Sequence, residues 1–213
     1  MEIKKTRNGH NDITSTLNSI GEFRLRKILF NRDSECLQPL LTLIEKQKHR
    51  TLVLWALEYA DELANKFETK YPNETRPREV VNACRAWARG EVKMPFAKKA
   101  IHAAHNAATE ITDDIVYCSI ARAIGQVVAT VHVETHAIGG PIYALTALTY
   151  ESGQDNAQAA IMKECNKLYE RLLYWEKNVD TVQMPWAEFL LRDDVPNKEK
   201  LLREKKEQKS HTL

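Results

Sequence analysis

The chain has 213 residues, enough for one large domain with a substantial core or for two small ones. Hydrophobic residues make up 43% and charged residues 28% of the sequence, which is ordinary for a globular protein in water. The formal net charge of +2 gives no electrostatic reason to expect nucleic acid or a membrane as a partner.

No run of about 18 apolar residues is present, so the sequence predicts no transmembrane helix. The first residues, MEIKKTRNGHNDITS, have no apolar segment after their basic residues, so no signal peptide is expected. The four cysteines are scattered without C-x-x-C spacing, which favours reduced thiols packed as small hydrophobic side chains. They are Cys36, Cys84, Cys118 and Cys165. We therefore expect a cytoplasmic protein.

Helical periodicity recurs from about residue 13 onward, and strand-like alternation is nearly absent. The first helical region covers 13–48, with a break near Asn31–Ser34 and a bend at Pro39. The next helix is expected over 50–70, because apolar residues recur there on one side and acidic residues on the other.

Thr75 and Pro77 indicate the start of another helix, as its cap and in its first turn. That helix runs to Arg89, and Gly90 suits the left-handed residue that ends it. An alanine-rich helix follows over 96–111.

Thr112-Asp113-Asp114 is expected to cap a long helix over 113–137. Gly139-Gly140-Pro141 then breaks the chain, and Pro141 starts a helix that continues to about Tyr150. The last clear amphipathic helix covers 154–176.

The segment 178–197 looks irregular, but Trp186, Phe189 and Leu190 are expected to dock on the bundle. The remaining residues are mostly charged and predict a solvated helix or a frayed tail. We divide the chain into an N-terminal helical extension packed on the core (1–48), a helical core domain (49–177), and a docking segment with a charged tail (178–213). The fold class is all-α, a single-domain array of antiparallel helices joined by short loops.

Two histidines, His132 and His136, are four residues apart with Glu134 between them, a spacing that places two imidazoles on one helix face. On a helix over 113–137 both would lie on a buried stripe beside small residues such as Gly125, while Glu134 would point to the opposite side. The sequence therefore favours buried imidazoles, with His132 bonded to a facing helix. It argues against a metalloprotease, whose glutamate directly follows the first histidine.

A metal centre is the alternative interpretation. His105, on the preceding helix, borders its apolar stripe, whereas its neighbour His102 is expected to be exposed. The metal candidates in this interpretation are His105, His132 and His136, because three imidazoles could hold zinc with one open position. No cysteine pair or well-spaced carboxylate completes this set, and no cofactor is expected.

Four arginines gather at the helix that follows Thr75, the last three on one face. They are Arg76, Arg78, Arg85 and Arg89. The preceding helix carries an acidic face formed by Glu58, Asp61 and Glu62. The arginines form either a basic stripe for an acidic partner or phosphate, or a solvated face paired with those acids. No Gly-rich phosphate loop or G-x-S-x-G elbow proposes an enzyme.

Seven short segments follow one another in the central part of the chain, over about 50–150. They are WA (55–56), YA (59–60), RPRE (76–79), CRAWARG (84–90), AAHNAA (103–108), ARAIGQVVATVHV (121–133) and HA (136–137). In this order they resemble the helical immunity-protein family of bacterial polymorphic-toxin systems. The chain departs from the family pattern in having valine or isoleucine where alanine is frequent, and in its long ends.

The resemblance implies a protein that binds a cognate toxin of its own cell and neutralises it by occlusion, without catalysis. Its interface would need aromatic or arginine anchors. The acidic face would suit a basic nuclease toxin, and the arginine stripe an acidic one. The competing hypotheses are the helical metal-binding enzyme and a structural or regulatory module, for instance a homodimer that packs through the small-residue face.

Overall fold

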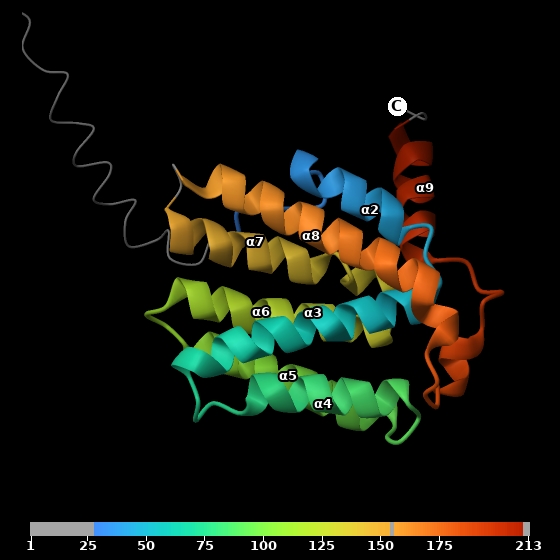
Figure 1. Ribbon diagram of the computed structural model, residues 1–213, viewed down its shortest axis with the longest axis horizontal. Helices are drawn as coiled ribbons and strands as arrows, with labels where there is room; N and C mark the ends of the chain where they lie inside the picture. Colours follow the sequence, from blue (N-terminus) through green and yellow to red (C-terminus); the bar gives the residue numbers. More distant parts are fainter. Residues whose placement is uncertain (1–27, 154–155, 211–213) are drawn as a thin grey trace, which may run out of the picture.

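The computed structural model describes residues 28–153 and 156–210. In these residues it contains eight α-helices, short 3-10 turns and no strand, which confirms the all-α prediction (Figure 1). The helices are α2 (Gln38–Ile44), α3 (His49–Lys70), α4 (Arg76–Ala88), α5 (Met94–Glu110), α6 (Ile115–Val128), α7 (Gly139–Ser152), α8 (Ala157–Asn178) and α9 (Lys198–Ser210). The 3-10 turns are η1 (Glu35–Leu37), η2 (Ala129–Val131), η3 (Glu134–His136), η5 (Val179–Thr181) and η6 (Glu188–Leu191).

The helices form an array in which α3 and α6 lie in the middle (Figure 1). Helices α7 and α8 cover one side of this pair, and α4 and α5 cover the other. From α3 to α8 the chain runs back and forth along the long axis, as short loops between helices require. Helix α9 stands across one end of the array, beside α2 (Figure 1).

Helix α3 is the central element because its first half is apolar on every side. The seven residues 51–57 are all buried, which is the pattern of a helix surrounded by others. Trp55 is 1% exposed, and its indole N–H donates to the carbonyl of Leu168 on α8 over 3.0 Å. That hydrogen bond satisfies the polar atom of a side chain that otherwise fills the core.

Glycines allow close contacts around α6. The His105 ring packs against Gly125, where an added Cβ would lie 2.8 Å from the imidazole Cε1. At Gly140 of α7, an added Cβ would lie 2.5 Å from the Cβ of Val127. The prediction that Gly125 permits close approach is therefore confirmed, and the approaching group is an imidazole.

Several boundaries match the sequence. Gly90 has φ +77°, as expected for the left-handed residue after α4. The Asp114 carboxylate accepts the Tyr117 N–H over 3.2 Å, so it caps α6. Thr75 precedes α4, but its hydroxyl donates to the Glu79 carboxylate and makes no cap hydrogen bond. Pro141 follows the start of α7 at Gly139 instead of forming it.

The predicted helix over 113–137 is wrong beyond Val128. The chain continues as η2, becomes extended at Val133 (φ −159°, ψ 140°), and then forms η3. Five of the seven residues in 127–133 are β-branched, and such side chains lose rotamer freedom in a helix. The positions predicted for His132 and Glu134 from a continuous helix are therefore wrong.

Both ends of the described chain were predicted in part. The break near Asn31–Ser34 is confirmed as a turn, whereas Pro39 lies in the first turn of α2 and causes no bend. Residues 13–27 of the first predicted helical region lie outside the described residues. Leu190 is 1% exposed and docks on the bundle as expected, and the predicted solvated helix is α9.

All four cysteines are free thiols, as predicted. Within the described ranges, every helix is too short or too polar to cross a membrane.

Candidate functional site

The three histidines of the alternative metal-centre interpretation have separate surroundings. His132 is exposed and stacks on Trp87, with ring centroids 6.0 Å apart and an interplanar angle of 26°. The prediction of a buried, hydrogen-bonded His132 is wrong, because α6 ends before it. His136 is half-buried, with Nδ1 3.1 Å from Oε1 of Gln126. Burial lowers the pKa of His105 and His136, as expected for packed neutral imidazoles.

Among the described residues, no group of three or more histidine, cysteine, aspartate or glutamate side chains is arranged to hold a metal ion. His102 is exposed, as predicted.

The arginines after Thr75 are tied to carboxylates of the same molecule. Arg78 contacts Asp61 (Nη1–Oδ1, 3.0 Å) and Glu68 (Nε–Oε1, 2.7 Å), and Arg85 pairs with the second oxygen of Asp61. Arg76 lies 2.5 Å from carboxylate oxygens of both Glu74 and Glu110. These guanidinium groups lower the pKa of Glu68, Glu74 and Glu110.

Arg89 makes only a 3.8 Å contact with Glu91. On the acidic face, Asp61 faces the arginines as the paired interpretation expects. Glu58 and Glu62 instead face α8, where they pair with Arg171 and Lys167. A role of these seven side chains in partner binding stays a prediction.

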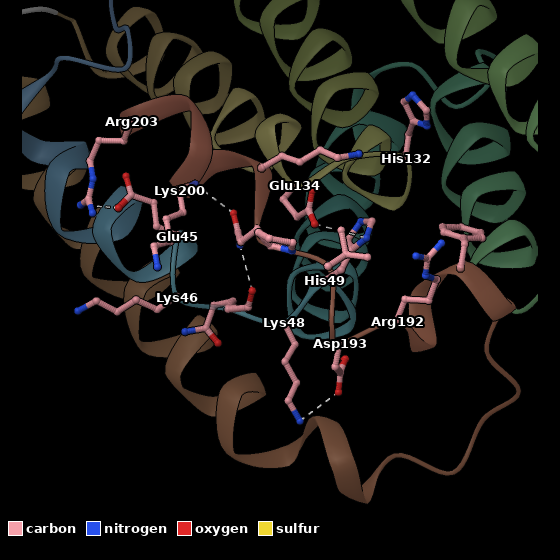
Figure 2. A pocket seen from close by; sticks show the side chains of 16 residues that line it. Glu45, Lys46, Lys48, His49, His132, Glu134, Arg192, Asp193, Lys200 and Arg203 are labelled. Atoms are coloured by element: carbon pink, nitrogen blue, oxygen red, sulfur yellow. Dashed lines mark hydrogen bonds and ion pairs between the residues drawn. The ribbon is translucent and has the colours of Figure 1, made fainter. Parts of the chain in front are cut away.

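A cavity of about 690 Å³ opens at the end of the array where α9 stands (Figure 2). Four separate stretches of chain line it: the end of α2 with the start of α3, the turns around η3, the end of η6 with the loop after it, and the first turns of α9. Sequence reasoning missed this site because its residues come from positions more than 140 apart in the chain.

The floor of the cavity is formed by His49 and Glu134, which point toward each other in Figure 2. The Nε2 atom of His49 lies 2.6 Å from the carbonyl oxygen of Thr130, so it carries the hydrogen and donates. Nδ1 then faces Oε1 of Glu134 at 3.8 Å. Burial outweighs both of these contacts and lowers the pKa of His49.

Glu134 is 5% exposed, so its predicted position on the far side of a helix is wrong. Its Oε2 atom is buried and has no hydrogen-bond partner within the described part of the chain. A buried carboxylate oxygen normally accepts at least one hydrogen bond. The floor therefore contains a buried acceptor, unpartnered by any described residue, beside an imidazole.

Aromatic side chains form a wall of the cavity beside the floor. Phe189 is 39% exposed, and its ring centroid lies 5.5 Å from Trp87 and 6.5 Å from His49. His132 stacks on the same indole. The backbone N–H of Ala187 donates to the carbonyl of Ala88 over 2.8 Å and fixes this segment on α4.

The rim carries more positive than negative side chains. Six lysines and arginines line the cavity, against three carboxylates. The basic residues are Lys46, Lys48, Arg192, Lys198, Lys200 and Arg203, and the acidic ones are Glu45, Glu134 and Asp193. Arg203 pairs with Glu45 at 2.6 Å and Lys48 with Asp193 at 3.5 Å, whereas Lys46 and Lys198 have no ion pair with any described residue.

Helix α9 is fixed to the array by its first turn. The Asn197 amide donates to the carbonyls of Ile44 (2.9 Å) and Gln47 (3.0 Å), and its oxygen accepts the N–H of Glu199 (2.9 Å). Glu199 is 3% exposed and pairs with Arg32, so a buried charge is compensated. One asparagine therefore caps the end of α2 and the start of α9, which closes this side of the cavity.

A family model described as "Imm-5 like putative immunity protein" matches residues 42–172, more than half of the chain. The match begins within α2 and ends within α8. It includes the floor of the cavity, whereas Phe189 and every lining residue after it lie beyond the matched range. Neither the curated proteins nor the solved structures gave a match.

Proposed function

Because the chain belongs to the Imm-5 like family of immunity proteins, we propose that it binds a cognate toxin and neutralises it by covering the toxin's active site. Family membership confirms the resemblance seen in the sequence and is the observation on which the proposal rests. It supports an immunity role in general, and the toxin partner and the occlusion mechanism are what we propose.

The cavity supports binding by surface complementarity. Exposed aromatic side chains beside charged ones are the composition of the residues that dominate protein interfaces. The wall of Phe189 and His132, which both contact the Trp87 ring, offers such anchors, and the rim lysines surround them. Occlusion needs only this complementarity and a rigid scaffold, which the buried α3 and its neighbours supply.

The arginine stripe and the acidic face are a second candidate surface. Binding through Arg78 or Arg85 would require their contacts with Asp61 to be shared or broken, which opposes association. The rim lysines carry no such cost, since Lys46 and Lys198 are without a carboxylate partner among the described side chains. We therefore place the toxin contact at the cavity first.

Co-expression with the product of the gene immediately upstream tests the function, if that product is toxic alone. We expect growth to be restored and the two purified proteins to elute as one complex. Occlusion further predicts that toxin activity falls in proportion to added protein and reaches its minimum at a stoichiometric ratio. An enzyme that inactivates the toxin would act at far lower ratios. Failure to restore growth, together with no complex, would contradict the proposal.

A further inference from the structure

We propose that the cavity at α9 binds an acidic peptide segment of a protein partner. Carboxylates of that segment would contact Lys46, Lys198 and Lys200 at the rim, and one of its hydrogen-bond donors would bond to Glu134 at the floor. The identity of the partner as a toxin rests on the proposed function. The acidic character of the segment follows from the cavity residues alone.

Part of the positive charge that lines the cavity has no neighbouring carboxylate among the described residues to neutralise it. Of the six cations that line the cavity, Arg203 and Lys48 are close to carboxylates of the lining itself. Lys200 reaches Glu204 only at 4.0 Å. Lys46, Lys198 and Lys200 are exposed and line the same cavity, so their fields add there and attract a ligand with several negative charges.

The buried Oε2 oxygen of Glu134 determines which kind of negatively charged ligand the cavity favours. This atom has no hydrogen-bond partner in the described part of the chain, so a ligand that reaches it must donate a hydrogen bond. A peptide has a backbone N–H at nearly every residue and can add carboxylates on either side. A phosphodiester backbone has acceptors only, and its charge would approach a buried carboxylate unfavourably. The cavity therefore favours an acidic peptide over a nucleic acid.

The site is also preorganised. Asn197 fixes the first turn of α9, which bears Lys198 and Lys200, to the carbonyls at the end of α2, which is next to Lys46. The backbone that bears the three lysines is consequently held in place, so only their side chains must be ordered on binding, which reduces the entropic cost of association.

The experiment compares two triple charge reversals. The rim variant is Lys46→Glu, Lys198→Glu and Lys200→Glu. The control variant is Lys93→Glu, Lys98→Glu and Lys99→Glu, which changes the net charge equally at α5, away from the cavity. All six lysines are exposed, so both variants should fold, and circular dichroism checks this.

The probe is a fluorescein-labelled oligoglutamate peptide, measured by anisotropy at low and at physiological salt. We expect the rim variant to bind it at least about tenfold more weakly than the unchanged protein, and the control to stay within about twofold. A second variant, Glu134→Leu, leaves the rim intact and removes both acceptor oxygens, so it should weaken binding with little change in salt dependence. Tighter binding would show that the floor makes no hydrogen bond to the peptide.

Equal weakening in the rim and control variants would overturn the proposal, because it would show non-specific attraction. Tighter binding of oligothymidylate than of the peptide would also overturn it, in favour of a nucleic acid. The same variants are then tested with the upstream gene product. If the unchanged protein binds that product and the rim variant binds it equally well, the site proposal fails while the proposed function stands. If the peptide result holds but the product is not bound, the proposed function fails instead.

Discussion

Replacing Gly140 with alanine should separate α6 from α7. The added Cβ would lie 2.5 Å from Cβ and 2.9 Å from Cγ2 of Val127, whereas carbon atoms in contact prefer about 3.5–4.0 Å. The Val127 Cβ is fixed by the backbone of α6, so no change of rotamer relieves the overlap. The two helices would have to move apart by about 1 Å, in the pair with the most extensive contact of the array.

The expected cost follows from these distances. Overpacking of a core costs about 1–3 kcal/mol, and the higher helix propensity of alanine offsets at most about 1 kcal/mol of that. Because the overlap is with a backbone-fixed atom, we take the upper part of that range, about 2–3 kcal/mol, and subtracting about 1 kcal/mol leaves a net loss of about 1–2 kcal/mol in the free energy of unfolding. For a chain of this size that corresponds to a melting temperature lower by roughly 2–8 °C.

Urea unfolding followed by circular dichroism measures this loss, with Gly139→Ala as the matched control. Both substitutions add the same group to the first turn of α7. At Gly139 the nearest atom is Oε1 of Gln126 at 2.9 Å, at the end of a flexible side chain, and the nearest backbone-fixed atom, Cβ of Gln126, lies at 3.2 Å, so the overlap is smaller than at Gly140. The control should therefore lose less stability. An unfolding midpoint for Gly140→Ala at or above that of the unchanged protein, or a larger loss in the control, would refute this reasoning.

Three further outcomes are expected. Asn197→Ala should release α9, which would reduce the circular dichroism signal at 222 nm and speed up proteolysis after α8. An unchanged cleavage pattern would contradict the role of Asn197 as a cap of both helices. Trp55→Phe should lower the free energy of unfolding by about 1–3 kcal/mol, because it removes the indole hydrogen bond and leaves a gap in the core. An unchanged free energy of unfolding would show that the hydrogen bond makes no net contribution to stability. The folded chain lowers the pKa of His49, His105 and His136, so the unfolded chain takes up protons first as the pH falls below about 6.5. Their contribution to stability is complete above that pH and is lost below it, and urea midpoints at about pH 8 and about pH 5.5 should show the decline.

Local signals in the sequence predicted most of the helices. Gly90 and Asp114 mark boundaries through backbone preferences that depend on a few adjacent residues, and apolar periodicity placed α3 and α8 to within a few residues. The long helix over 113–137 failed for a local reason too. Its β-branched run was visible, but the apolar period appeared to continue through it.

The cavity could not be predicted in the same way. His49 begins a helix and has no sequence neighbour that suggests a partner, and it meets Glu134 only because the chain turns after α6. The rim depends on α9 reaching the end of α2, a contact between positions about 150 apart. One usable signal was present: Asn197 follows a proline and precedes a charged helical run, which is the pattern of a helix cap. It indicates a helix start, but not the carbonyls that the same amide binds.

The cavity draws its lining from two sources. Its floor lies within the range shared with the family, whereas Phe189 and the lysines of α9 belong to a C-terminal piece outside that range. If the cavity binds the toxin as we propose, some of the residues that face the partner come from outside the range that the family model matches. Grafting 178–213 from this chain onto a relative would then change which toxin the relative binds, while the shared helical framework is kept.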